Sequence, residues 1–199
     1  MFTFSKPNDE AVGRFLSHQA GLPYSYAEVG CTRKGCGPPA GYEVDRLRVC
    51  LGRGRDVFER ARVAISGWKM FSREMCGLYW PDAPIETGSV AGVLFRAGCL
   101  WSLNACRVIY AIEESGGQIQ YGFAYGTLPG HLERGEERFT VQWQREDDSV
   151  WYELLAHSRP RHLLARLGYP WIRYQQARFR KLSGRAMQRA CAEGSQQES

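Results

Sequence analysis

The side chains best suited to acid–base chemistry gather in one short segment, Tyr125–Phe139. It holds one histidine, His131, and three carboxylates, Glu133, Glu136 and Glu137. An imidazole and several carboxylates on one tight loop can converge on a bound group as general acid and base, or can supply oxygen ligands to a metal ion. His131, Glu133 and Glu137 are therefore the candidate catalytic residues, although no motif names a reaction for them.

The segment is expected to be a hairpin loop between two strands. Pro129 and Gly130 form a turn signal, because proline presets φ for the first turn position and glycine accepts the positive φ of the next. A second interpretation is also open, in which Arg134 and Arg138 pair with the acids and the loop is simply solvated. Both interpretations place the loop at the rim of a sheet, where it would gate a cavity.

A central predicted strand carries a second group of polar side chains. Alternation along the strand places Asn104 and Tyr110 on one face and Trp101 and Arg107 on the other. An arginine midway along such a strand must meet an anion, a carbonyl group or solvent, since a buried unpaired charge is costly. Arg107 is thus either a structural ion-pair partner, with Glu153 across the sheet, or the anchor for an acidic ligand head group.

Tyrosine and tryptophan are frequent in the predicted sheet. Their rings are apolar and their hydroxyl or indole groups are polar, so they suit the wall of a ligand cavity, although most aromatic residues in an antiparallel sheet belong to the core. The candidate ligand-binding residues are Trp101, Asn104, Arg107, Tyr121, Tyr125, Trp143, Trp151 and His157.

Hydrophobic periodicity and turn residues predict an α+β chain. Helices are expected at Asp9–Ser17 and Arg55–Ser72, and short strands at Tyr24–Gly30 and Val44–Leu51. Five further strand-like runs are separated by short turns: Glu86–Arg96, Leu100–Glu113, Gln118–Thr127, Arg138–Gln144 and Val150–Ser158. Consecutive strands with short connections pair antiparallel, so these runs are expected to form a meander.

Prolines divide the C-terminal part of the chain into two predicted helices. Pro160 opens the first, Gly168 fits its C-cap, and Pro170 fits the first turn of a second helix that runs to about Cys191. The expected fold is a helix grip, a curved antiparallel sheet of about six to seven strands wrapped around the long C-terminal helix. A bent sheet and a straight helix leave a cavity between them, which is a natural place for a ligand.

Several sequence blocks resemble uncharacterised protein family 0548, which occurs in bacteria and plants. The blocks are Tyr24–Gly30, Pro81–Ile85, Trp101–Arg107, Tyr125–Phe139, Asp148–Tyr152 and Ser158–Pro160, and the likeness spans roughly Tyr24 to Met187. The family is similar to the START-like superfamily that includes the birch-pollen allergen. The resemblance implies a helix-grip fold and a hydrophobic ligand, and it brings no catalytic residues with it.

The 199 residues are expected to form a single domain over 1–191, with an N-terminal extension over 1–23, closing helices over 159–191 and a disordered tail over 192–199. The sequence lacks a run of roughly 20 apolar residues and a secretory signal, so a cytoplasmic protein is expected. Cys31 and Cys36 lack a second Cys or His pair at a zinc-like spacing. Neither a metal nor a cofactor is therefore predicted.

Positive charge is concentrated near the C-terminus. Arg159–Cys191 holds eight arginines and one lysine with no acidic residue, in a chain whose net charge is +5. Such a run is either the solvated face of a helix or a weak contact surface for nucleic acid or an anionic membrane. The residues that would make the contact are Arg173, Arg178, Arg180, Lys181 and Arg185.

Three functional hypotheses follow from these patterns. The leading one is a protein that binds a small hydrophobic or amphipathic molecule between sheet and C-terminal helix, with Arg107 or Tyr125 fixing its polar end. The second is an enzyme of the same fold, a hydrolase, cyclase or isomerase that uses His131 with Glu133 or Glu137. The third is an interaction module whose basic helix docks on nucleic acid or an anionic membrane.

Overall fold

The computed structural model describes residues 1–33, 35–72, 76–79, 83–97, 99–116, 118–160 and 169–192. Its helices are α1 (Asp9–Ala20), α2 (Arg55–Ser66) and α4 (Tyr169–Ala192). Its strands are β1 (Phe2–Thr3), β2 (Glu43–Arg53), β3 (Cys76–Tyr79), β4 (Val90–Ala97), β5 (Leu100–Glu114), β6 (Gln118–Thr127), β7 (Glu133–Gln144) and β8 (Ser149–Pro160). All strand pairs are antiparallel, in the order β2-β8-β7-β6-β5-β4-β3, and β1 pairs with the start of β5.

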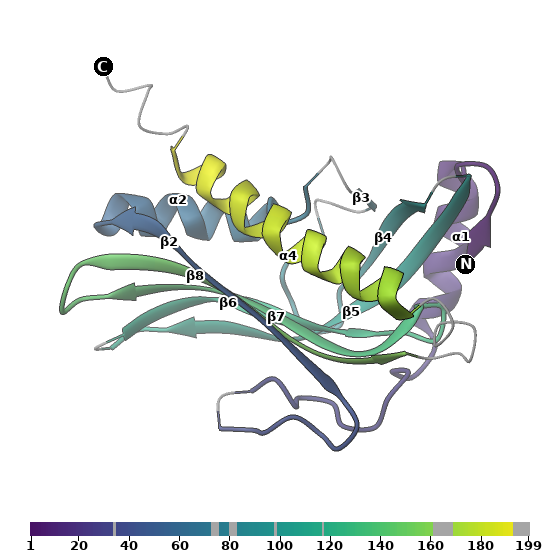
Figure 1. Ribbon diagram of the computed structural model, residues 1–199, viewed down its shortest axis with the longest axis horizontal. Helices are drawn as coiled ribbons and strands as arrows, with labels where there is room; N and C mark the ends of the chain where they lie inside the picture. The colour runs from purple at the N-terminus through teal and green to yellow at the C-terminus, as the bar shows by residue number, and fades with distance from the viewer. Residues whose placement is uncertain are drawn as a thin grey trace.

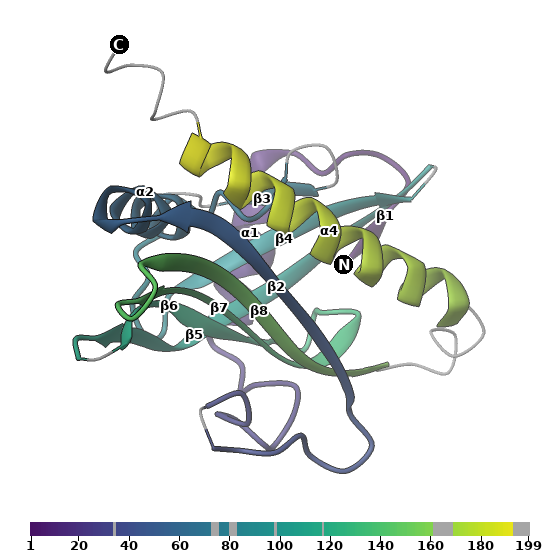
Figure 2. The same ribbon diagram turned by 60° about the vertical axis from the view of Figure 1, so that its left-hand side comes forward.

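The sheet curls beneath helix α4, which lies across its concave side (Figures 1 and 2). Helix α2 packs beside α4 over the same side of the sheet. One buried core joins both helices to the sheet. It contains Phe58 and Ile65 of α2, Phe179 and Met187 of α4 and Phe139 of β7. The predicted class, an α+β helix grip built on a curved antiparallel sheet, is confirmed.

The convex side of the sheet has a smaller core of its own. Helix α1, which Asn8 caps by accepting the Ala11 N–H at 2.9 Å, lies against β4 and β5. Its buried residues Val12 and Leu16 pack with Leu103 of β5. The convex side is therefore covered by protein here, and the side chains of β4 and β5 that point to α1 are buried.

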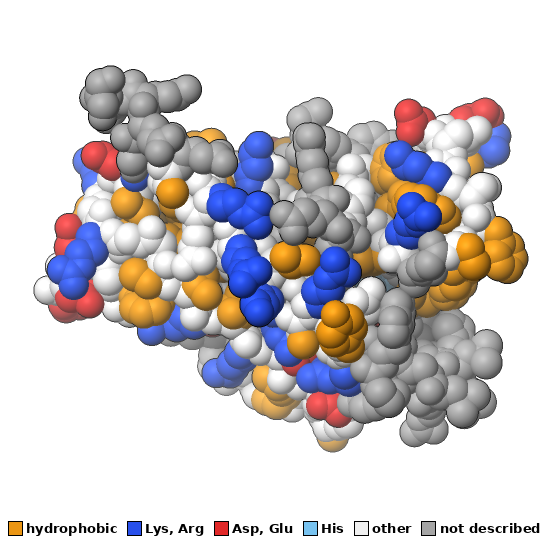
Figure 3. Space-filling view, turned by 45° about the horizontal axis from the view of Figure 1, so that its top comes forward, with side chains coloured by type: hydrophobic (Ala, Val, Ile, Leu, Met, Phe, Trp, Pro, Cys, Tyr) orange, Lys and Arg blue, Asp and Glu red, His pale blue; other side chains and the backbone are white. Residues whose placement is uncertain are grey.

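Helix α4 presents two chemically different sides. Phe179, Leu182 and Met187 are buried, whereas Arg178, Lys181 and Arg185 are exposed; the last three belong to the basic group predicted from the sequence. Figure 3 shows Lys and Arg side chains gathered over the middle of this outer face. Of the five basic residues that the sequence offers for an anionic partner, these three lie on the exposed side of the described helix.

Several observed elements differ from the predicted ones. Tyr24–Gly30 is not a strand: the segment bends across the convex side, and Ser25 N–H donates to the Thr127 carbonyl at 2.9 Å. Helix α2 ends at Ser66 and not at Ser72, because the chain turns at Trp68, whose φ is +53°. The short strand β3 was not predicted, since four residues give too little periodicity.

The C-terminal elements are only partly described. Pro160 is the last residue of β8, since β7 and β8 stay paired as far as Glu133 and Pro160. The helix predicted before Gly168 lies outside the described residues, as does the predicted tail apart from Ala192, which ends α4. Helix α4 confirms the long closing helix. None of the helices in the described part of the chain is long and apolar enough to cross a membrane.

Candidate functional site

A pocket of about 210 Å³ lies between the concave side of the sheet and helix α4. One water molecule takes up about 30 Å³ in the liquid, so this space has room for a small organic molecule. Apolar side chains form much of its wall, namely Phe71, Val93, Phe95, Leu100, Leu132 and Phe179. Polar groups also reach it from β2, β5, β6, β7 and α4, namely Asp45, Asn104, Tyr125, Glu133, Glu137 and Gln176.

Strand β7 carries Glu133 and Glu137 into this pocket. The strand begins at Glu133, five residues earlier than the sequence pattern predicts. The loop before it contracts to a turn, in which His131 N–H donates to the Leu128 carbonyl at 2.9 Å. The two acids therefore lie on a paired strand and not in a solvated hairpin loop.

Gly135 allows β7 to stay paired with β8 between these two acids. Its φ is +150°, and a Cβ atom at this position would lie 1.9 Å from the carbonyl oxygen of His157. Its N–H donates to Thr127 Oγ1 on β6 at 3.0 Å. Because side chains alternate along a strand, Glu133 and Glu137, two residues to either side of Gly135, share the concave face.

Glu137 is a carboxyl group in apolar surroundings. The hydroxyl of Tyr125, itself buried, donates a hydrogen bond to its Oε2 atom. Burial is the main reason that the pKa of Glu137 rises to about 8; the Tyr125 hydrogen bond lowers this pKa, while the charges of Glu133 and Asp45 raise it. The Glu137 carboxyl is therefore largely protonated at neutral pH.

Glu133 is held by a side chain of the closing helix. Gln176 of α4 donates through Nε2 to Glu133, and also to Ser158 of β8 at 3.3 Å. Burial raises the pKa of Glu133 to about 7, and the Gln176 hydrogen bond opposes that rise. Gln176 thus joins α4 to the polar side of the pocket.

His131 and Asn104 complete the polar lining near the β6–β7 turn. The Nδ1 atom of His131 accepts the N–H of Glu133 at 3.0 Å, so in the neutral ring the proton is on Nε2. Asn104 is 1% exposed, accepts the N–H of Leu132 at 3.1 Å and donates to the Val93 carbonyl at 3.3 Å. All three candidate catalytic residues, His131, Glu133 and Glu137, border the same pocket.

Asp45 on β2 fixes the position of α4 over the pocket. Arg173 donates to its two oxygens at 2.7 and 2.8 Å, and Arg180 approaches it at 2.6 Å. Two of the five basic residues that the sequence offers for an anionic partner are therefore engaged in an internal ion pair. Asp45 is 6% exposed, so the two guanidinium groups compensate a buried charge.

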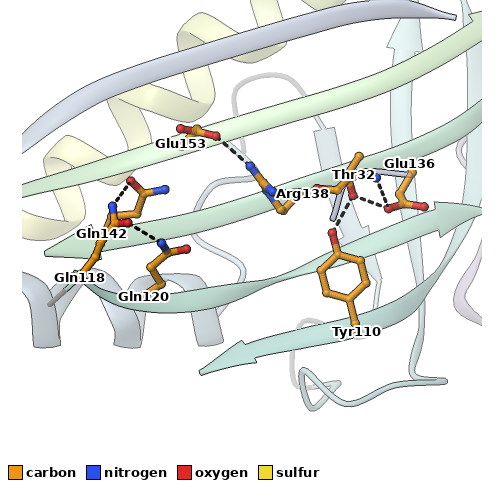
Figure 4. Close-up of polar contacts among 8 residues, drawn as sticks. All are labelled: Thr32, Tyr110, Gln118, Gln120, Glu136, Arg138, Gln142 and Glu153. Carbon is orange, nitrogen blue, oxygen red and sulfur yellow. Dashed lines mark hydrogen bonds and ion pairs between the residues drawn. The ribbon is translucent and has the colours of Figure 1, made fainter. Parts of the chain in front are cut away.

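Glu136 is turned away from the pocket, although it belongs to the same predicted acidic group. On the convex side its carboxylate accepts the N–H of Gly30 at 2.7 Å, the N–H of Thr32 at 3.0 Å and the hydroxyl of Tyr26 at 3.0 Å. Thr32 also contacts Tyr110 at 2.7 Å. Figure 4 shows Glu136, Thr32 and Tyr110 beside the ion pair between Arg138 and Glu153. Glu136 thus holds the segment that covers the convex side.

The predicted ligand-binding residues are divided between different parts of the sheet. Asn104 and Tyr125 border the pocket. Tyr121 and Trp143 lie on the concave side near α2, where the Tyr121 hydroxyl contacts Ser66 Oγ at 2.8 Å and Trp143 packs on Phe58.

The others alternate to the convex side. Trp101 packs with the α1 cluster, and Trp151 lies under Arg48, whose guanidinium carbon is 4.0 Å from the ring centroid. His157, which is 1% exposed, is paired in register with Glu136. Burial lowers the pKa of His157. None of these three is among the described residues that border the pocket.

Arg107 also lies on the convex side, where it meets carbonyl groups. Its Nη2 atom donates to the carbonyls of Ala20 at 2.6 Å and Leu22 at 2.9 Å, at the end of α1. Glu153, its suggested partner, pairs with Arg138 at 2.9 Å. Of the options open to a mid-strand arginine, the structure thus shows the carbonyl contact, which stabilises the helix C-terminus.

A bulge changes the faces that simple alternation predicts for β5. The register shifts between Val108 and Tyr110, so Tyr110 points to the convex side, opposite to Asn104. The prediction that Asn104 and Tyr110 share a face is wrong for this reason, since one extra residue in a strand reverses every side chain after it.

Two functional residues were not predicted, although the sequence holds a signal for each. Asp45 alternates with Leu47 and Val49 on β2, so an acid occupies an inward position of that strand. Gln176 precedes Phe179 by three residues on α4, which puts a polar side chain on the apolar stripe. In both β2 and α4, a polar residue at a position where the pattern expects an apolar one indicates that the side chain borders a pocket.

Comparisons with known proteins agree with this architecture. A family model described as a domain of unknown function (DUF1990) matches residues 25–186. A UPF0548 protein of Dictyostelium discoideum is 32% identical over 195 residues, which cover 90% of this chain and 90% of that protein. A UPF0548 protein of Deinococcus radiodurans is 32% identical over 200 residues, covering 96% of this chain and 98% of that protein.

Among solved structures, a norcoclaurine synthase point mutant of Thalictrum flavum in complex with a transition state analogue is similar in fold. The TM-score is 0.51 and the sequence identity 9%, and the likeness covers 77% of this chain and 96% of that chain. At this identity the likeness concerns the fold alone.

Proposed function

We propose that this chain, which belongs to the family described as a domain of unknown function (DUF1990), holds a small amphipathic molecule in the pocket between its sheet and helix α4. The observation that carries the proposal is the pocket, where an apolar wall faces a group of converging polar side chains. Ligand sites commonly combine a mostly apolar wall with a few placed polar groups.

The pocket leaves unfilled space inside the molecule. Protein cores are packed as densely as organic crystals, and a void loses the contacts that its lining atoms would otherwise make. A carboxyl group beside such a void also loses solvation, as the raised pKa of Glu137 indicates. A molecule with an apolar body and one polar end would restore both kinds of contact.

The fold comparison supports the proposal. The norcoclaurine synthase structure contains a transition state analogue, so that protein of similar fold accommodates a small molecule. A small molecule needs an apolar wall and polar contacts. In this chain Phe71, Phe179 and Leu100 would supply the wall, and Tyr125 and Glu137 would supply the polar contacts.

The test is to look for a bound molecule and to block its space. Protein purified from cells is expected to retain a small molecule that native mass spectrometry detects as added mass. Ala156 borders the pocket from β8, so Ala156→Leu is expected to fill part of it and to lower the bound fraction at least about tenfold. Ala111→Leu, on an exposed position of β5, is the matched control and should leave the bound fraction unchanged.

Two results would contradict the proposal. One is wild-type protein that is consistently empty and shows no thermal stabilisation by any member of an amphiphile library. The other is a bound molecule whose occupancy is the same in wild type and in Ala156→Leu, because such a molecule would lie elsewhere.

A second candidate function, acid–base catalysis on the bound molecule, is favoured by one specific observation. Burial raises the pKa of Glu133 to about 7 and that of Glu137 to about 8, which brings two carboxyl groups of one pocket close to neutral pH. A general acid or base works best when its pKa is near the working pH. Incubation of the captured molecule with excess protein should then convert it to a product of different mass, and Glu137→Gln should abolish the conversion even at ligand concentrations that saturate the variant.

A further inference from the structure

We infer that the molecule held in this pocket is a small amine, with an apolar body and one protonated nitrogen that pairs with Glu137. The inference rests on the proposed function, because it names the class of ligand for the same pocket. It starts from the distribution of charge on the polar side of the pocket.

Three carboxylates and two guanidinium groups meet at this side. Asp45, Glu133 and Glu137 border the pocket, and both Arg173 and Arg180 bind Asp45. Among the described residues that border the pocket, Arg180 is the one lysine or arginine. A positive charge beside Glu137 favours the ionised form of this carboxyl. With all three carboxylates then ionised, the group carries one negative charge more than the two guanidinium groups compensate, and the single positive charge of the ligand balances it.

The fourth carboxylate near the pocket does not change this balance. Glu136 sends its oxygens to the convex side, where Tyr26, Gly30 and Thr32 donate to them. Its charge is therefore stabilised by hydrogen-bond donors of another part of the molecule. The charge inside the pocket is set by the three carboxylates on the concave side.

Glu137 has one carboxylate oxygen that can accept a hydrogen bond from a ligand. Tyr125 donates to its Oε2 atom, and no described residue donates to its Oε1 atom. Glu133, in contrast, is bound by Gln176 of the closing helix. Glu137 borders the pocket, so this oxygen can accept from a molecule held there, and an ammonium group supplies N–H donors together with a positive charge.

The aromatic wall also favours a cation over an anion. Phe71 and Phe179 border the pocket with ring centroids 5.5 Å apart, and Phe71 stacks on Tyr125 at 6.3 Å. Aromatic faces attract ammonium groups. An acidic head group would instead meet like charges, and Arg107, the anchor suggested for it by the sequence, is on the convex side.

A set of three ligands that share one tail tests the inference. Hexylamine, 1-hexanol and hexanoate would be titrated into ¹⁵N-labelled protein at pH 7.5, with affinities taken from chemical shifts of pocket residues. Hexylamine is expected to bind about tenfold more tightly than 1-hexanol, with hexanoate the weakest. Glu137→Gln should remove most of this preference while 1-hexanol still binds, and Glu86→Gln, which removes an exposed acid outside the pocket, should leave the preference intact.

The possible outcomes separate the inference from the function on which it rests. If 1-hexanol or hexanoate binds wild type as tightly as hexylamine, the amine is the wrong ligand class and the pocket still binds a small molecule. If Glu137→Gln keeps the full preference for hexylamine, the nitrogen does not pair with this carboxylate and the inference fails. If none of the three binds and the wild-type protein is also empty when purified, the proposed function fails and the inference with it.

Discussion

Glu137 shows how one buried side chain sets the pH response of the molecule. Its pKa is raised from 4.5 to about 8 in the folded chain, mainly by burial. Between these two values the unfolded chain has lost the proton that the folded chain keeps, so the free energy of unfolding falls as the pH rises. This loss of stability is absent well below the pKa of the unfolded chain and complete well above the pKa of the folded chain.

Replacement of Glu137 by glutamine should therefore stabilise the protein only at higher pH. Glu137→Gln cannot ionise, so its pH-dependent gain in the free energy of unfolding over wild type is expected to be below about 1 kcal/mol near pH 5 and on the order of 4 kcal/mol near pH 8.5. Urea unfolding at pH 5, 7 and 8.5 measures the difference. The charged and titratable groups around this carboxyl stay in place: Tyr125, Glu133, Asp45, Arg180, Cys76, Cys106 and Tyr152.

The matched control for this experiment is Glu86→Gln, which removes an exposed carboxylate and should give no gain that depends on pH. A wild-type stability that stays constant from pH 5 to pH 8.5 would contradict the account of Glu137.

Arg107 gives a contrasting prediction at the same scale. Because it binds carbonyl groups at the end of α1, Arg107→Met is expected to lower the free energy of unfolding by about 1–3 kcal/mol. Ligand affinity should not change, since the side chain is on the convex side. Chemical denaturation and ligand titration of one sample measure both quantities. A large loss of affinity at unchanged stability would instead assign Arg107 to the ligand.

At the scale of elements, the site depends on where β7 begins. The sequence pattern predicts Arg138 as the first residue, because the charged residues before it resemble a solvated loop. The strand in fact starts at Glu133, since β8 pairs with it from Glu133 and β6 pairs with it from Glu136. Pairing with two neighbours is a tertiary effect that local periodicity does not contain.

Gly135 is the residue on which this early start depends. Gly135→Ala would put a Cβ atom 1.9 Å from the His157 carbonyl oxygen, so β7 and β8 would have to separate. The expected loss is more than about 2 kcal/mol in the free energy of unfolding, with faster amide hydrogen exchange at the start of β7. Gly116→Ala is the control, because nothing lies within 4 Å of a Cβ atom there. Equal stability of the two variants would show that the close approach at Gly135 is unimportant.

At the scale of the whole molecule, the helix grip could be predicted because each strand and helix carries its own periodicity and turn residues. The meander β4–β8 and the closing helix α4 were found in this way. The face on which a side chain lies was harder to predict. The bulge before Tyr110 determines the face on which Tyr110 lies, and the segment that binds Glu136 covers the convex face. Both features depend on contacts between residues distant in sequence.

The candidate site could be predicted in part for the same reason. His131, Glu133 and Glu137 are brought to one pocket, and Asn104 and Tyr125 join them from neighbouring strands. Phe71 and Phe179 complete the wall; periodicity marks both as packing residues but does not show that they meet at the pocket. The sequence identifies side chains that could bind a ligand, and the curvature of the sheet determines which of them border the pocket.

The most direct test of the central claim is a crystal structure of the protein purified from cells without added ligand. Electron density for an organic molecule is expected inside the pocket, in contact with Phe71, Phe179 and Glu137, and absent from Ala156→Leu. A pocket that contains only water in wild type, or a molecule that lies only in the hollow between α2 and the far ends of β5 and β6, would contradict the account.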